Sequence, residues 1–238
     1  MAPLLGLTEY EARLALVTPP PAIVQTTSSR DRATETAAVL RGRGHGAHIF
    51  DEESFVPSDK MAKLDDFRLD GEGVRRVQDG DFLPYGDVFA ILRAVHASSS
   101  EVERPSAQRG IRADLDMRNV NDAYRVVTKS YEREQVAYFF RRSGERPWIL
   151  RERHARYDGL GQERGPVAIG NFTRTVDRIR DVSPTAAYDD RLVRRRVPER
   201  VREDSLLRAR YRTSREGIDL LAHLLAMAIL TVGGSPYR

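Results

Sequence analysis

The apolar stretch at residues 218–230 most constrains how this chain can fold. Thr213 followed by Glu216 has the spacing of a helix capping box, so a helix is predicted to begin there. The stretch is apolar on most faces, and such a helix must be buried against its own core or against another chain. Asp219 and His223 interrupt it, and it falls short of the roughly 20 apolar residues that a membrane span needs. We therefore predict a buried C-terminal helix and no membrane span.

The 238-residue chain contains no cysteine, which excludes disulfides, thiolate metal sites and cysteine nucleophiles. Its first residues lack a charged segment and a long apolar run, so they do not resemble a secretory signal peptide. These features predict a soluble, cytoplasmic protein. The length fits one or two domains, because domains hold roughly 100–200 residues each.

Residues 1–60 are predicted to form a helix followed by a βαβ unit. Residues 22–26 are a short apolar, β-branched run, and residues 47–50 are another, so both are predicted as strands. Between them a helix is predicted near residues 30–42, begun by Ser28 or Ser29 and ended by glycines.

Residues 61–183 are predicted to form an antiparallel sheet with a covering helix. Short strands are expected at 67–69 and 74–77, and the Asp79-Gly80 pair predicts a hairpin turn before a further strand. Residues 87–97 fit a helix or a strand, and the preceding meander favours a strand. The polar residues 98–122 are predicted to be a loop or a poorly ordered excursion. A buried strand is expected at 136–140 and a returning strand at 147–150, and then a helix from about residue 166. The expected fold class is α+β.

Short antiparallel strands followed by one helix with an apolar face resemble a bacterial pleckstrin-homology-like domain. Residues 67–91, 136–150 and 169–179 carry the resemblance, which covers roughly half of the chain and is a pattern of elements without a sequence motif. It implies a binding or scaffolding module with no catalytic residues to carry over. The βαβ unit and the long excursion at 98–122 depart from that fold.

Residues 184–238 are predicted to be an arginine-rich arm that leads to the C-terminal helix. Residues 191–215 hold ten arginines and three acidic residues, whereas the rest of the chain is net negative. The arm either neutralises phosphates of nucleic acid or of anionic lipid, or it is a solvated surface segment that pairs with the acidic remainder of the chain. The candidate basic patch consists of Arg194, Arg195, Arg196, Arg200 and Arg202.

Hydroxyls and backbone N–H groups at the start of the first predicted helix make a candidate anion site. Such a turn can hold a phosphate, although serine and threonine are also the ordinary capping residues. The residues of this candidate site are Thr27, Ser28, Ser29 and Arg30. His45 and His48, with Asp51 or Glu52, are a weaker metal-binding alternative to a polar loop.

The chain contains no nucleotide-binding glycine motif and no nucleophile elbow, so we predict no catalytic residues, no metal and no cofactor. Trp148 and the aromatic residues at 138–140 are predicted to be core and not a surface for base stacking. The favoured function is a binding or regulatory module with a protein partner or self-association. The alternatives are a nucleic-acid-associated protein that uses the basic arm and an enzyme of unrecognised type.

Overall fold

The computed structural model describes residues 8–10, 12–13, 21–105, 125–194 and 214–231, and it has both helices and sheets. The predicted α+β class is confirmed. The helices are α3 (Arg30–Gly42), α4 (Ala168–Asp181), α5 (Arg191–Arg194) and α7 (Ser214–Thr231), with short 3-10 turns η1 (Glu52–Ser54), η2 (Tyr85–Asp87) and η3 (Asp158–Glu163).

A five-stranded mixed sheet forms the centre of the molecule. Its order is β1 (Ala62–Lys63), β7 (Trp148–Arg151), β6 (Arg125–Arg141), β5 (Val88–Pro105) and β8 (Ala187–Asp190). The three inner strands are antiparallel, but β1 runs parallel to β7 and β8 runs parallel to β5. The prediction of an antiparallel sheet is therefore wrong at both edges, because the edge strands arrive by long crossovers that local turn signals do not reveal.

A second, three-stranded antiparallel sheet consists of β2 (Phe67–Leu69), β3 (Gly73–Arg76) and β4 (Phe82–Pro84). Asp70 closes its first turn, because the Asp70 Oδ1 accepts the N–H groups of Glu72 and Gly73 at 2.9 and 2.8 Å. Gly80 in the second turn has a φ of 74°, a conformation that glycine adopts at no steric cost. The strands predicted from this part of the sequence and the predicted turn at Asp79-Gly80 are confirmed.

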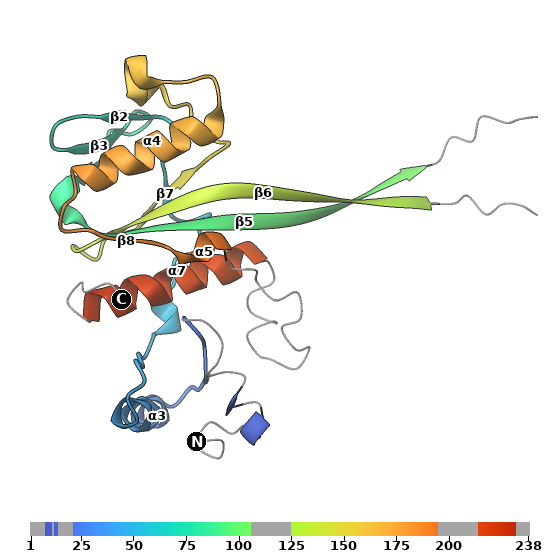
Figure 1. The fold of residues 1–238 in the computed structure, drawn as a ribbon, viewed down its shortest axis with the longest axis vertical. Coiled ribbons are helices and arrows are strands. Elements are labelled where there is room, and N and C mark those ends of the chain that lie inside the picture. The colour runs from blue at the N-terminus through green and yellow to red at the C-terminus, as the bar shows by residue number, and fades with distance from the viewer. Residues whose placement is uncertain (1–7, 11, 14–20, 106–124, 195–213, 232–238) are drawn as a thin grey trace, which may run out of the picture.

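The central sheet is covered on both faces (Figure 1). The small sheet and α4 lie on one side, where Phe67, Trp148, Phe172 and Ile179 share one core. Trp148 is only 1% exposed, so its predicted place in the core is confirmed.

Helix α7 covers the other face of the central sheet. Ile218, Ala222, Leu225 and Ala226 pack in a second core with residues of β5, β6 and β7. The predicted burial of the C-terminal helix is confirmed. Among the described residues, no helix is both long and apolar enough to cross a bilayer.

The N-terminal βαβ unit is correct in its helix and wrong in its strands. Ser29 caps α3 as expected, but residues 21–29 and 45–50 belong to no strand. Ile23 and Ile49 are 37% and 40% exposed, so these apolar runs do not fill the core of a sheet. Helix α3 lies beyond α7, on the side away from the central sheet (Figure 1).

Two further segments differ from expectation. The predicted strand at 87–97 is confirmed, but residues 98–105 continue it as β5 and are not a loop, while residues 106–122 lie outside the described residues. Strand β8 and helix α5 come from the predicted arginine-rich region, yet β8 belongs to the same sheet as the strands of residues 61–183. A hydrogen-bonded bridge joins Ala94 to Leu192 next to it.

Candidate functional site

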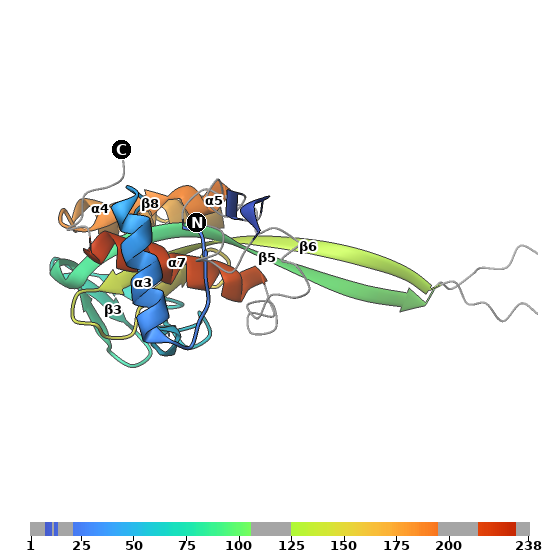
Figure 2. The ribbon, with the colours of Figure 1, turned by 90° about the horizontal axis from the view of Figure 1, so that it is seen from below.

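A two-stranded ribbon projects from the body of the molecule, as both views show (Figures 1 and 2). We define the ribbon as Ala97–Pro105 of β5 and Arg125–Arg133 of β6, which pair in unbroken antiparallel register. Strand β7 pairs with β6 only at residues 136–139, and β8 pairs with β5 only at residues 90–92. No strand in the described part of the chain therefore flanks the ribbon. Two-stranded hairpins are marginally stable alone, so an added strand would stabilise it.

Gln135 shows which backbone groups of β6 point away from β5. The Gln135 carbonyl accepts the Glu152 N–H at 2.9 Å, and the Gln135 N–H donates to Glu152 Oε2 at 3.2 Å. Alternate residues of an antiparallel strand direct their groups to the same side, and the register is regular back to residue 125. The outward-facing residues on the ribbon part of β6 are therefore Arg125, Val127, Lys129, Tyr131 and Arg133.

The two edges of the ribbon differ in their ability to accept a strand. Directly opposite residues share their hydrogen-bonding direction, so Ser99, Glu101, Glu103 and Pro105 face outward on β5. This edge has three consecutive serines at 98–100, two glutamates and a proline without an N–H, which are features that protect sheet edges. The β6 edge is rich in β-branched and aromatic residues and contains no proline. It is therefore the edge suited to strand addition.

The base of the ribbon is held by the buried carboxylate of Glu134. Glu134 Oε1 accepts the Arg153 N–H at 3.1 Å and lies 2.7 Å from His154 Nδ1. The same loop supplies Glu152, which engages both backbone groups of Gln135. The outer edge of β6 is thus occupied as far as Gln135, and the unflanked part begins at Arg133.

On the α7 face, a buried polar cluster joins the helix to the sheet. Asp219 Oδ1 accepts the Tyr138 hydroxyl at 2.7 Å and lies 3.0 Å from His96 Nε2, while Asp219 Oδ2 accepts the Ser58 N–H at 2.8 Å. Because a carboxylate only accepts, His96 Nε2 carries a proton here. His96 Nδ1 is buried without a hydrogen-bond partner among the described residues.

Burial and hydrogen bonding oppose each other in this cluster. Burial raises the pKa of Asp219, but the hydrogen bonds from His96, Tyr138 and the Ser58 N–H outweigh it, so the pKa of Asp219 is lowered. Burial and the neighbouring Asp219 carboxylate raise the pKa of Tyr138 well above its usual value. Asp219 and Tyr138 are fully buried, and His96 is 3% exposed. With no surface for a substrate to reach, the cluster serves to fix α7 at the base of the ribbon.

His223 extends this attachment to the segment before β1. Its Nδ1 lies 2.9 Å from the Asp219 carbonyl, and its Nε2 accepts the Val56 N–H at 3.4 Å. The rings of Phe50, Phe55 and Phe140 surround it at centroid distances of 5.0–6.3 Å. Burial lowers the pKa of His223, although Asp219 opposes this shift. The neutral imidazole is therefore the form that this site holds.

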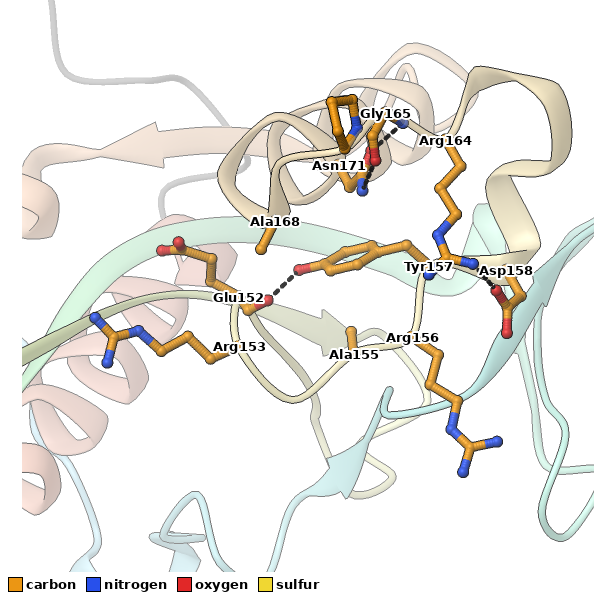
Figure 3. Close-up of a pocket in the computed structure, with 11 residues that line it drawn as sticks. Glu152, Arg153, Ala155, Arg156, Tyr157, Asp158, Arg164, Gly165, Ala168 and Asn171 are labelled. Atoms are coloured by element: carbon orange, nitrogen blue, oxygen red, sulfur yellow. Dashed lines mark hydrogen bonds and ion pairs between the residues drawn. The ribbon is translucent and has the colours of Figure 1, made fainter.

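A pocket of about 360 Å³ lies between the loop after β7 and the start of α4 (Figure 3). Tyr157 stands in it with a φ of 60°, and its hydroxyl donates to the Glu152 carbonyl at 2.8 Å. Three arginines line the pocket, and each pairs with a carboxylate: Arg153 with Glu132, Arg156 with Asp66 and Arg164 with Asp158. The side chains of Arg153 and Arg156 extend away from Tyr157 in different directions (Figure 3). The pocket therefore offers no convergent charge for a ligand, and we assign it no function.

The predicted anion site lies at the exposed start of α3. Ser29 Oγ accepts the Arg32 N–H at 3.3 Å, and Thr27 Oγ1 accepts the Ser29 N–H at 3.1 Å. The Ser29 hydroxyl thus performs the capping that was the alternative explanation, and Thr27 binds the backbone of that capping residue. Ser28 and Arg30 are exposed beside them, and anion binding there stays a prediction.

The other predicted sites are only partly placed by the structure. Among the described residues, no group of three or more histidine, aspartate or glutamate side chains is arranged to hold a metal. His48 Nδ1 lies 2.9 Å from the Thr231 hydroxyl at the end of α7. Arg194 is exposed at the end of α5. The remaining residues of the basic patch, Arg195, Arg196, Arg200 and Arg202, lie outside the described residues.

Sequence reasoning missed both the ribbon and the buried cluster. The ribbon was hidden because serines, glutamates and a proline are typical of loops. The cluster had a signal, since Asp219 and His223 interrupt an otherwise apolar helix and a buried helix tolerates such residues only with partners. No protein-family model matches this chain, and no curated protein or solved structure was found to match it.

Proposed function

We propose that this chain is a protein-interaction module whose ribbon binds an extended polypeptide segment by strand addition along β6. The observation that carries the proposal is the outer edge of β6 at residues 125–133, which no described strand covers. Main-chain hydrogen bonds supply affinity in this mode of recognition, and alternate side chains supply specificity. The resemblance to pleckstrin-homology-like modules also implies a binding function.

The charge of the ribbon favours a polypeptide over nucleic acid. The ribbon has four basic residues (Arg104, Arg125, Lys129 and Arg133) and three acidic residues (Glu101, Glu103 and Glu132). β-Ribbons that enter nucleic-acid grooves depend on neutralising phosphates, which needs a strong excess of positive charge. A nearly neutral ribbon does not supply it, whereas backbone pairing with a peptide requires no net charge.

The base of the ribbon supports the proposal because it holds the edge in place before binding. Glu134 ties the 152–154 loop to β6, and Asp219 ties α7 to the neighbouring part of the sheet. A preorganised strand loses less conformational entropy when a partner adds to it. Location in the cytoplasm stays a prediction that accompanies this proposal.

Two proline variants test the proposal. The N–H of Val127 faces outward, so Val127→Pro removes a donor from the β6 edge and leaves the β5–β6 ladder intact. Ser99→Pro is the matched control, because it makes the same change at an outward-facing position of the β5 edge. Circular dichroism and the emission of Trp148, the single tryptophan, check that both variants fold.

The measurement is quantitative affinity capture from an extract of the native cell. We expect proteins captured by the wild type and by Ser99→Pro to be lost with Val127→Pro. Equal capture by all three proteins, or equal loss in both variants, contradicts binding at the β6 edge.

A further inference from the structure

We infer that the strand added to β6 is β6 of a second copy of this chain, in an antiparallel pair centred on Ser130. This inference rests on the proposed function and names its partner. Each copy would then supply the flanking strand that β6 of the other copy lacks. Because the ribbon extends beyond the body, two copies can meet along it with their bodies at opposite ends (Figure 2).

Symmetry limits the registers that two copies of β6 can adopt. In an antiparallel pair of identical strands, a two-fold axis perpendicular to the sheet places one residue directly opposite the same residue of the second copy. We name each register by this central residue. Centring on Lys129 or Glu132 puts like charges opposite each other, and centring on Tyr131 puts Lys129 opposite Arg133. Directly opposed like charges destabilise a sheet. Centring on Val126 avoids this but pairs only residues 125–127 of the ribbon, so Thr128 and Ser130 remain as centres.

The base of the ribbon favours Ser130 over Thr128. Centring on Ser130 pairs residues 127–133 of the two copies and forms about eight backbone hydrogen bonds through their outward-facing groups. Pairing then ends beside Gln135, whose backbone groups Glu152 already engages. Centring on Thr128 pairs residues 125–131 instead, and it leaves the outward groups of Arg133, next to this base, without a partner from the ribbon of the second copy.

The pairing also limits the assembly to two copies. The two ribbons together make a four-stranded sheet, and three or more strands are what independent stability requires. Its outer edges are the two β5 edges, which carry the serine run, the glutamates and Pro105. These edges resist further strand addition, so the assembly ends as a dimer and does not grow.

The absence of cysteine makes the test direct, since any introduced thiol is the only one in the chain. Ser130 faces β5 with its backbone groups, so across the dimer it forms a non-hydrogen-bonded pair with its copy. Cα atoms in such pairs are about 4.5 Å apart, within the range that a disulfide spans. Ser130→Cys is therefore expected to give a disulfide-linked dimer on a non-reducing gel after mild oxidation.

Ser100→Cys is the matched control. Ser100 pairs with Ser130 across the ribbon of its own chain. In the dimer the two copies of position 100 are about three strand spacings, or about 14 Å, apart. Ser100→Cys should remain monomeric on the same gel. Light scattering of the purified proteins should give a dimer for the wild type and for Ser99→Pro, and a monomer for Val127→Pro.

The inference is overturned if the wild type is monomeric and Ser130→Cys forms no cross-linked dimer. It is also overturned if Val127→Pro is still a dimer. A dimer sensitive to Val127→Pro that does not cross-link through Ser130→Cys overturns the register. The proposed function is judged separately by capture from cell extract. If the wild type is monomeric but Val127→Pro still loses captured proteins, strand addition stands and its partner is a different polypeptide.

Discussion

Asp219 is the residue on which the attachment of α7 depends most. Its carboxylate accepts from the Ser58 N–H and from Tyr138, with His96 Nε2 at 3.0 Å, so it joins one helix to three separate segments. Hydrogen bonds to a charged group contribute roughly 1.5–3 kcal/mol each, more than neutral ones do. Apolar packing places α7 on the sheet, and Asp219 fixes its rotation and its position along the strands.

His223 predicts how the stability of the protein responds to pH. Burial holds the pKa of His223 below 6.5, so at mildly acidic pH the unfolded chain binds a proton that the folded protein does not bind. The stabilisation by neutral His223 is therefore full above about pH 6.5 and is lost as the pH falls from there through the lower folded pKa. His223→Gln, which cannot titrate, should make the unfolding free energy depend less steeply on pH between about 7 and 5.

The measurement is urea unfolding followed by Trp148 emission at several pH values. The control is His45→Gln, the same change at an exposed position, which should keep the wild-type slope. If the slope of His223→Gln equals that of the wild type, protonation of His223 is not what destabilises the folded protein at acidic pH.

At the scale of elements, α7 is held by residues that face the central sheet. Leu225 is 5% exposed and belongs to the core beneath α7, whereas Leu230 is 55% exposed. Truncation of a buried leucine removes apolar contacts and leaves a cavity, at a cost of about 2–5 kcal/mol. Leu225→Ala should therefore lower the free energy of unfolding by that amount in chemical denaturation. Leu230→Ala should change it by less than about 0.5 kcal/mol, and a larger loss there would mean that the end of α7 is covered.

The elements that the sequence predicts well are those with strong local signals. The Asp79-Gly80 turn, the buried strand at 136–140 and the amphipathic helix after residue 166 are all present. Residues 22–26 and 47–50 look like strands because they are apolar and β-branched. Within the part of the chain that the structure describes, no strand pairs with them, and Ile23 and Ile49 remain partly exposed. β-Propensity takes effect only where a neighbouring strand pairs.

The ribbon shows the opposite error. Residues 98–105 have the composition of a loop, and pairing with β6 extends them as a strand. The partner residues are 20 or more positions away in the sequence, so no short window reveals the pair. The candidate site therefore depends on a non-local contact, which explains why periodicity and motifs did not locate it.

At the scale of the whole molecule, basic residues are concentrated at 191–215 while the rest of the chain is net negative. This distribution allows a test of the hypothesis that the arginine-rich arm binds nucleic acid. Residues 191–215 carry ten arginines, but the first of them, Arg191, already pairs with Asp189 at 2.7 Å. We expect no detectable binding to duplex DNA at physiological salt, by the wild type or by the triple variant in which Arg194, Arg195 and Arg196 are replaced by alanine.

Fluorescence anisotropy with a labelled duplex at increasing salt is the measurement. Wild-type binding with a log–log salt slope of about −4 to −5, made shallower in the triple variant, would establish phosphate contacts by the arm. That result would replace our preference for pairing with acidic residues of the same chain.

The position of α7 in the chain sets the order in which parts of this protein can fold during synthesis. Residues 214–231 leave the ribosome after every strand that they cover. At about 5–20 residues per second, roughly 4–16 s separate the end of β7 from the end of α7. Throughout that interval the apolar face around Leu92 and Ile149 lacks the cover of α7, and the Tyr138 hydroxyl lacks its acceptor Asp219. The nascent chain therefore exposes an aggregation-prone apolar surface until α7 docks. A chaperone that shields this surface would raise the yield of folded protein.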